Sequence, residues 1–439
     1  MLEKEPGFRS AWLDYVIVGA LMLMSGTPVI MGLVREEISY VLTSFFFLTV
    51  LLFRKEPPFT ARFLVVVPVL SAILVIQCIT FNFWPFHTMI GFMLRVFIGY
   101  AAVRLVSEFP RRYVRVIYYL CIISFFFHSF TVLRLTTGLD LVQYFKPISK
   151  IVNPLWGTNV VVHQFHAYGR TPDYGRMQPL LPFRNCSCFW EPGVFSAYIL
   201  LAFVFLGLTR DKFDKRQYKR NFAVLVTALF TTISTTGYAL LPLSWLFHVR
   251  DLSPTRRQLP KLLAFALVVA LFYVVAYQLS FVGGKIKKHL DSVAYSEPSW
   301  RATRLGTLVY DVEEYISKYP LFGCGLNFQT RYALSSEEDS VHKQGNGLSD
   351  FTVKFGLLGV ATVLISIWTG VHKLTGRQWK RSALFVFFVV MVLNGERLLN
   401  FSVYLGLMFL EPMSKSRQSI LGFENSTITG YKRNLSTRF

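Results

Sequence analysis

Two arginines in the second half of the chain have the spacing that a phosphate-binding pair needs. Arg301 and Arg304 lie three residues apart and would share one face of a helix. Two guanidinium groups placed in this way can grip a pyrophosphate through bidentate hydrogen bonds, and such cations stabilise a leaving group that gains charge. Pairing with an acid such as Asp311 on a solvated helix face explains the same spacing equally well.

Two further arginines lie within or beside apolar runs. Arg95 is well inside the fourth run, where a charge is costly and usually functional, so we expect it to face a polar cavity. The alternative is an arginine that extends to the interface or pairs with Glu396 or Glu411. Arg397, next to Glu396, leaves the same two explanations open.

The segment 184–193 opens an apolar run with an acid and a proline. Glu191 would lie in the first turn of a helix, where the helix dipole favours negative charge, and Pro192 suits the first helical position. A functional interpretation makes Glu191 a general base for a sugar hydroxyl and Trp190 a stacking surface for the sugar. Spacing alone favours the structural explanation.

Other kinds of site find little support in the sequence. There is no phosphate-binding Gly-rich loop ending in Lys-Ser or Lys-Thr, and there is no Asp-x-Asp pair. His163 and His166 lack further metal ligands at suitable spacing, so we predict neither a metal nor a cofactor. Cys186 or Cys188 could bridge to Cys324 in an oxidising compartment, although unpaired packing cysteines are the simpler interpretation.

The composition indicates a polytopic membrane protein with helices throughout. Hydrophobic residues make up 53% of the 439 residues, charged residues only 16%, and the chain contains 42 phenylalanines. Apolar runs recur along the whole length, so we predict one membrane domain over 1–439 without a cleavable signal peptide. The net charge of +21 comes from short basic connectors, which argues against nucleic-acid binding.

We predict about twelve transmembrane helices from the apolar runs. Their ranges are 13–34, 38–53, 62–80, 88–107, 113–135, 190–208, 221–236, 237–249, 262–282, 349–371, 382–394 and 401–412. In this arrangement the basic connectors and both termini lie on one side, which should be the cytoplasm. Single long helices at 221–249 and 382–412 are the alternative to the paired helices, but the first would place a basic loop outside.

Two long polar segments fall on the opposite face and are the best places to seek chemistry. These predicted periplasmic loops span about 136–189 and 283–348. The predicted hairpin tips, Thr235 to Tyr238 and Asn394 to Arg397, open onto the same face. Irregular backbone at that depth is tolerated where it lines a cavity or is buried in protein.

Several short motifs occur in an order that resembles a known family. Arg184, Trp190-Glu191-Pro192-Gly193 and then Ser234 to Tyr238 resemble the Wzy-type oligosaccharide repeat-unit polymerases. The later motifs are similar to a pattern shared with the O-antigen ligases; they are Arg301 with Arg304, Tyr319 to Gly325, His342 with Asn346-Gly347, and Lys354 to Gly359.

This resemblance implies a metal-independent, GT-C-like membrane glycosyltransferase at the periplasmic face of a bacterial inner membrane. It would polymerise undecaprenyl-diphosphate-linked repeat units into O-antigen, capsule or a related polysaccharide. Arg301, Arg304 and Arg95 would hold the pyrophosphate, and His342 or Glu191 would accept or orient the acceptor proton. The other substrate-binding residues implied are Arg184, Trp190, Tyr238, Asn346 and Arg397. The spacer Lys343-Gln344-Gly345 after His342 departs from the closer His–Asn spacing of the family.

The resemblance also implies partners in the same pathway, namely a flippase and a chain-length regulator, besides membrane lipids and the lipid-linked oligosaccharides.

Two rival functions remain. A ligase that transfers glycan to the lipid A core shares the histidine-loop pattern, whereas Glu191-Pro192-Gly193 and the long first loop favour a polymerase. A transporter of lipid-linked sugars would also need many helices, but no internal repeat is visible and the candidate residues gather toward one face.

Overall fold

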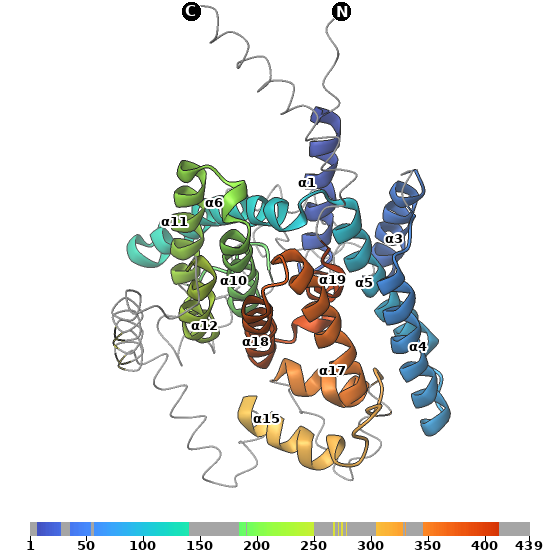
Figure 1. The fold of residues 1–439 in the computed structure, drawn as a ribbon. Coiled ribbons are helices and arrows are strands. Elements are labelled where there is room, and N and C mark those ends of the chain that lie inside the picture. The colour runs from blue at the N-terminus through green and yellow to red at the C-terminus, as the bar shows by residue number, and fades with distance from the viewer. Residues whose placement is uncertain are drawn as a thin grey trace, which may run out of the picture.

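The described part of the protein is built from helices alone. The computed structural model describes residues 7–27, 36–53, 57–139, 184–189, 191–249, 304–327 and 346–411, together with a few single positions between them. Every regular element within these residues is a helix and none is a strand, which confirms the predicted all-α class (Figure 1).

Four helices in the described part are long and apolar enough to cross a membrane. They are α4 (Ala61–Phe81), α5 (Phe86–Leu105), the stretch Phe109–Phe130 of α6 (Phe109–Thr137), and α17 (Gly347–Leu374). The shorter helices α1 (Gly7–Leu23), α3 (Glu36–Leu52) and α10 (Pro192–Leu208) are also apolar over most of their length. The helices therefore fit an α-helical membrane protein, as the composition predicts.

Each predicted helical range that falls on described residues contains a helix, but the first range is wrong at its end. We predict a helix to residue 34, whereas α1 ends at Leu23 and a turn follows. Gly26 has a φ of +95°, and Thr27 precedes Pro28, which disfavours helical backbone at the residue before it. The predicted range 262–282 lies outside the described residues except for single positions.

Both stretches that could have been single long helices are interrupted, as predicted, and the first forms a pair. This pair is α11 (Lys215–Thr231) and α12 (Thr235–Trp245), which is extended by η4 (Leu246–His248). The two helices are antiparallel, because Tyr218 near the start of α11 contacts His248 at 2.5 Å, and the Phe222 and Trp245 rings lie 5.1 Å apart. The tip is Thr232 to Ser234, so the predicted tip residues 235–238 instead form the first turn of α12.

The second stretch contains α18 (Trp379–Gly395) and the short helix α19 (Ser402–Gly406), which packs against α5. With five residues, α19 is too short to be the membrane-spanning helix predicted at 401–412. The single turns η7 (Leu398–Asn400) and η8 (Leu407–Phe409) flank α19. Glu396 and Arg397 lie at the tip as predicted, whereas Asn394 and Gly395 still belong to α18. The helix ends there because Glu396 takes an extended conformation with φ −148° and ψ 148°.

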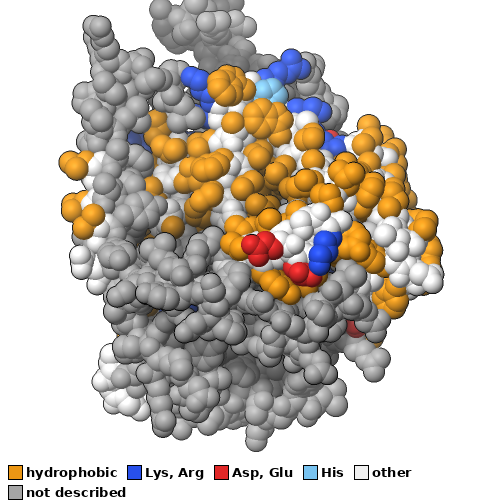
Figure 2. Space-filling view, turned by 90° about the horizontal axis from the view of Figure 1, so that it is seen from below, with side chains coloured by type: hydrophobic (Ala, Val, Ile, Leu, Met, Phe, Trp, Pro, Cys, Tyr) orange, Lys and Arg blue, Asp and Glu red, His pale blue; other side chains and the backbone are white. Residues whose placement is uncertain are grey.

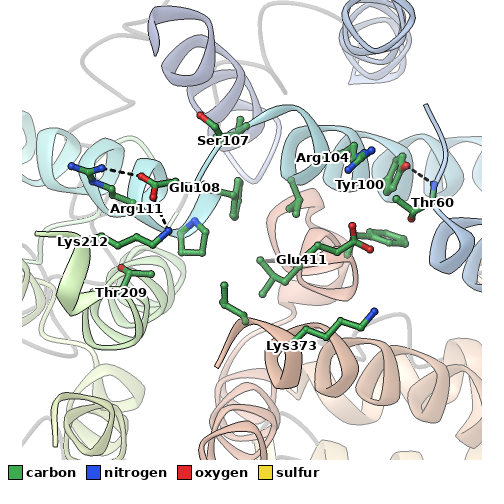
Figure 3. A pocket seen from close by; sticks show the side chains of 17 residues that line it. Thr60, Tyr100, Arg104, Ser107, Glu108, Arg111, Thr209, Lys212, Lys373 and Glu411 are labelled. Carbon is green, nitrogen blue, oxygen red and sulfur yellow. Dashed lines mark hydrogen bonds and ion pairs between the residues drawn. The ribbon is translucent and has the colours of Figure 1, made fainter. Parts of the chain in front are cut away.

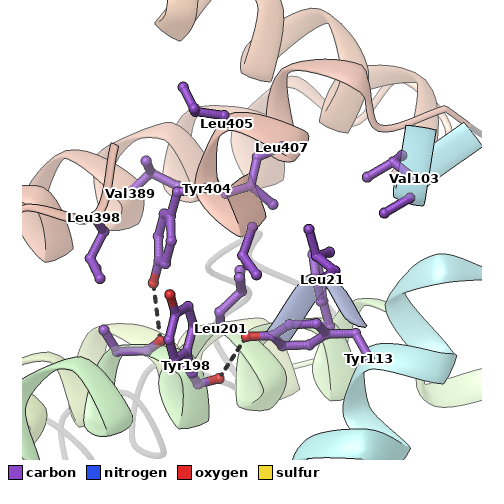
Figure 4. Packing of buried hydrophobic residues seen from close by; sticks show 14 of the residues in the cluster. Leu21, Val103, Tyr113, Tyr198, Leu201, Val389, Leu398, Tyr404, Leu405 and Leu407 are labelled. Atoms are coloured by element: carbon purple, nitrogen blue, oxygen red, sulfur yellow. Dashed lines mark hydrogen bonds between the residues drawn. The ribbon is translucent and has the colours of Figure 1, made fainter. Parts of the chain in front are cut away.

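The helix α10 forms the centre of the core. Its residues 192–207 are all buried, as expected for a helix that is apolar on every side. Tyrosine hydroxyls fasten its carbonyls to neighbouring helices: Tyr113 of α6 donates to Tyr198 O at 3.3 Å, and Tyr404 of α19 donates to Ala197 O at 3.1 Å (Figure 4). The Tyr404 bond thereby joins α10 to the C-terminal part of the chain through neutral groups.

The helix α17 is broken at Gly356, which has φ +64° and ψ −177°. The loop 320–325, which follows α15 (Arg304–Asp311) and the π-helical turn η6 (Val312–Ile316), crosses the break. Leu357 N donates to Pro320 O at 2.8 Å, and Cys324 N donates to Val353 O at 2.7 Å. The freed backbone groups of the break are thereby satisfied, as they must be at membrane depth. The structure thus joins two motifs of the family resemblance.

The outward faces of several helices are apolar. Val41, Leu42 and Phe45 on α3 are each more than half exposed, as are Tyr119 and Phe126 on α6. Seen from the end where α15 lies, the described surface is mainly hydrophobic and carries charged side chains only in small groups (Figure 2). Continuous apolar surface of this kind suits contact with lipid rather than water.

Basic connectors meet at one end of the molecule. Glu108, between α5 and α6, accepts hydrogen bonds from Arg111 at 2.9 Å and from Lys212 of η3 (Arg210–Lys212) at 2.6 Å. Arg381, at the start of α18, donates to Val249 O at 3.2 Å, so the connector after η4 lies at this end too. The gathering agrees with connectors that share one side of a membrane.

The Glu108 cluster should make stability depend on pH in the acid range. Burial alone would raise the pKa of Glu108, but the hydrogen bonds from Lys212 and Arg111 outweigh it and lower the pKa below its ordinary value of 4.5. Stability from this carboxylate is therefore fully present above pH 4.5 and is lost as pH falls through the lower folded pKa. We expect Glu108→Gln to lower the apparent Tm at neutral pH and to flatten its decrease in acid.

The matched control for this prediction is Asp211→Asn, which neutralises an exposed carboxylate of the neighbouring turn η3. This variant should keep the acid dependence of the wild-type protein. An unchanged acid dependence in Glu108→Gln would show that Glu108 does not couple folding to protonation.

Candidate active site

A cavity lined by both charged and apolar side chains opens at the end opposite the basic connectors. It has a volume of about 510 Å³ and lies between α3, α5, α17 and the tip that follows α18. Glu37 and His87 mark its mouth, since each is the second residue of its helix and the far ends of α3 and α5 reach the connectors. The polar side chains that line it are Glu37, Tyr40, His87, Thr88, Arg95, Lys354, Arg397 and Asn400.

Arg95 faces this cavity from the middle of α5, as expected of an arginine at that depth. Its guanidinium lies over the Tyr40 ring of α3, with 4.8 Å between Cζ and the ring centroid. Stacking of this kind stabilises the guanidinium at a fixed position on the wall of the cavity. Glu411, one of the two ion-pair partners considered, lines a different cavity at the connector end.

Lys354 supplies a second cation, which we did not predict as a site residue. It is two residues before the break in α17, and its Nζ donates to Asp350 at 2.7 Å and to Asn400 at 3.5 Å. Gln77 of α4 donates to Lys354 O at 2.7 Å, which fixes the backbone at this point. The pair Asp350 and Lys354 has the spacing of an ordinary helix ion pair, so the sequence gives no signal that it faces a cavity.

Arg397 supplies the third cation, and a tight junction holds it in place. The buried Glu396 lies against Gly193 at the start of α10, and a Cβ at residue 193 would overlap its carboxylate. In the same way Gly347, at the start of α17, lies against the backbone of Glu396 and Arg397. Three predicted segments, namely Glu191 to Gly193, the tip of α18 and the start of α17, therefore meet beside the cavity.

Comparison with known proteins does not assign the chain to a family. No protein-family model matches the chain, and no curated protein matches it either. The chemistry of the cavity therefore has to follow from its own side chains.

Three cations from separate segments suit a doubly or multiply charged anion. Arg95, Lys354 and Arg397 line one cavity, and among the described residues Glu37 is its one acidic lining side chain, while Asp350 binds Lys354. Guanidinium forks and an ammonium group together match the oxygens of a pyrophosphate. At the mouth, His87 Nε2 lies 3.8 Å from Glu37 Oε1, and an imidazole oriented by a carboxylate can accept a proton. Sequence reasoning missed both of these residues.

Glu191 occupies the N-cap of α10 in an extended conformation, and Pro192 begins the helix. No backbone N–H of the first turn donates to the Glu191 side chain, which is half-buried. The structural explanation by the helix dipole and a general-base role both fit this position. Trp190 lies outside the described residues.

Arg184 and Tyr238 fasten the turn between α11 and α12. Arg184 Nε donates to Thr232 O at 3.1 Å, and the Tyr238 hydroxyl donates to Phe230 O at 2.7 Å. Neither residue lines the cavity around Arg95. These bonds give both residues a structural role, and their predicted substrate binding remains a prediction.

Asn346 caps α17, because its Oδ1 accepts from Leu348 N at 3.0 Å and from Ser349 N at 3.1 Å. Its Nδ2 donates to Asn394 Oδ1 at 3.2 Å, which ties the cap to the tip of α18. The predicted residues His342 and Arg301 lie outside the described residues. Arg304 begins α15, but the structure describes only its backbone.

The five cysteines all belong to the described residues, and each is a buried thiol that forms no disulfide. The bridge considered between the two long loops is therefore absent, and the simpler interpretation as packing residues is confirmed. Cys324 packs with Tyr315 and Val353 beside the break in α17. Within the described ranges, no three histidine, cysteine or acidic side chains gather at a distance suited to a metal ion.

Proposed function

We propose that the protein is a metal-independent membrane glycosyltransferase that polymerises undecaprenyl-diphosphate-linked oligosaccharide units into a surface polysaccharide. The observation that supports it best is the convergence of Arg95, Lys354 and Arg397 at one cavity. In such a reaction a sugar hydroxyl of the acceptor attacks the anomeric carbon of the donor, and the bond to the lipid pyrophosphate breaks. The pyrophosphate takes the electron pair, so cations fixed around it stabilise the transition state.

The proposed topology has about twelve spans, a GT-C-like architecture and both termini in the cytoplasm of a bacterium. The gathering of basic connectors at one end supports this orientation, because short basic loops favour the cytoplasmic side. The cavity around Arg95 then opens toward the periplasmic face, where lipid-linked units are delivered. The flippase and the chain-length regulator remain proposed partners at that face.

Acceptor activation needs a residue that takes a proton from the attacking sugar hydroxyl. Glu191 or His342 would take the acceptor proton, and the pair of His87 and Glu37 is an additional candidate that the structure supplies. Arg301 and Arg304 would extend the cationic surface toward the incoming unit. In an in-line displacement that inverts the anomeric carbon, the base and the cations would lie on opposite sides of that carbon.

A chromosomal deletion followed by gel analysis of surface polysaccharide tests the function. We expect the deletion to leave a single repeat unit on the lipid A core, because transfer to the core continues while polymerisation stops. Complete loss of attached glycan, with polymer stranded on its lipid carrier, would instead identify a ligase. An unchanged polysaccharide ladder would contradict both the polymerase and the ligase hypotheses and would favour a transporter.

A further inference from the structure

A second polar cavity lies at the connector end, far along the same helices from Arg95. It has a volume of about 280 Å³ and is bounded by the ends of α5 and α17, the start of α6 and the last described residues (Figure 3). Its lining includes four basic side chains, Arg104, Arg111, Lys212 and Lys373, and two acidic ones, Glu108 and Glu411. The cavity shares no lining residue with the candidate active site.

The charges in this cavity fall into two groups. On one side, Arg111 and Lys212 both donate hydrogen bonds to the Glu108 carboxylate, at 2.9 and 2.6 Å, so these three side chains form an ion-pair cluster. On the other side are Arg104 and Lys373, and the Glu411 carboxylate points into the space between these two side chains (Figure 3). Basic groups outnumber acidic ones, so an anion bound here would be attracted by the whole lining.

The walls between the charged groups are apolar. Val103, Phe409 and Leu410 line the cavity beside Arg104 and Lys373. A soluble phosphate ester would use only the polar part of such a site, whereas a phospholipid could place its phosphate among the cations and its glycerol and first methylenes on the apolar wall. Basic pockets between helices at a membrane surface are suited to anionic headgroups.

We propose that this connector-end cavity binds a phosphate group through Arg104 and Lys373, and that an anionic phospholipid headgroup is the source its lining favours. The site is independent of the proposed transferase activity. Arg104 already donates to Pro57 O at 3.5 Å, which orients its guanidinium, while a guanidinium carries five N–H donors in total. A phosphate held there would link α5 to the end of α17 and stabilise the folded protein.

The test titrates the purified full-length protein in neutral detergent and follows its apparent Tm. The probes are phosphatidylglycerol, phosphatidylethanolamine and inorganic phosphate. We expect phosphatidylglycerol to raise the Tm and phosphatidylethanolamine to have little effect. The double variant Arg104→Gln/Lys373→Gln should bind phosphatidylglycerol about tenfold more weakly, because two surface cations are lost.

Two further variants separate binding from misfolding. Glu411→Gln removes a carboxylate from the lining and should strengthen the response to phosphatidylglycerol, which a damaged protein would not do. Lys380→Gln removes an exposed cation of α18 that does not line the cavity, and it should respond like the wild type. A response to inorganic phosphate that equals the lipid response would support the phosphate site and identify a soluble source. An equal phosphatidylglycerol response in the double variant and the wild type would overturn the proposal.

Discussion

Under the proposed function, Arg95→Gln is expected to reduce the transfer rate by about 10²- to 10³-fold, because it removes a fixed cation from the place where the leaving pyrophosphate would gain charge. The guanidinium is held over the Tyr40 ring, so it needs no rearrangement as the reaction proceeds. Glutamine keeps a similar length and hydrogen-bonding capacity but carries no charge. Long-chain polysaccharide should disappear from the gel while the protein still inserts in the membrane.

The matched control for this variant is Arg220→Gln. Arg220 also lies over a tyrosine ring, at 5.2 Å from Tyr118, but it is exposed on α11 and lines neither polar cavity. Its replacement should leave the chain-length distribution unchanged. With purified protein, Arg95→Gln should lower kcat more than it raises KM, since the lost interaction is strongest in the transition state. Normal chain length in Arg95→Gln at normal expression would rule out the proposed role of this cavity.

The helices were largely predictable from the sequence, because apolar length and connector charge are properties of local segments. The paired helices at 221–249 follow from the basic residues after Val249, and the structure has the turn near the predicted place. The end of α1 was not predicted, because the apolar run continues beyond Leu23 and hydropathy does not register the backbone at Gly26. The backbone conformation at Gly26, rather than the hydropathy of the run, thus determines where the helix ends.

The candidate site was only partly predictable. Arg95 was identified because an isolated charge inside an apolar run is costly, and that cost is visible in the sequence. Arg397 was identified beside Glu396 at a predicted tip between two apolar runs. Lys354 was missed because the nearby Asp350 explains its charge within one helix turn. Its place in the cavity depends on the break in α17 and on the loop that crosses it, and both arise from contacts between segments distant in the chain.

Gly356→Ala is expected to lower the free energy of unfolding by about 3 kcal/mol or more. This is the largest effect on stability that we expect. The conformation at residue 356 is one that essentially only glycine adopts, and an added Cβ would overlap the carbonyl of Leu321 in the loop that crosses the break. Relief would require the loop and the helix to separate, which would break the bonds from Leu357 N and Leu358 N to that loop. The apparent Tm of the purified protein should fall markedly.

Gly376→Ala separates backbone strain from the steric overlap. Gly376 has nearly the same φ, +65°, but a Cβ there would meet no atom within 4 Å, so only strain of about 1–2 kcal/mol is expected. The decrease in Tm should therefore be much smaller than for Gly356→Ala. Equal decreases in Tm would mean that contact between the loop 320–325 and the break in α17 contributes nothing to stability.

Because Lys354 is two residues from Gly356, the Gly356→Ala protein should also lose transfer activity at temperatures where it is still folded, whereas Gly376→Ala should keep it.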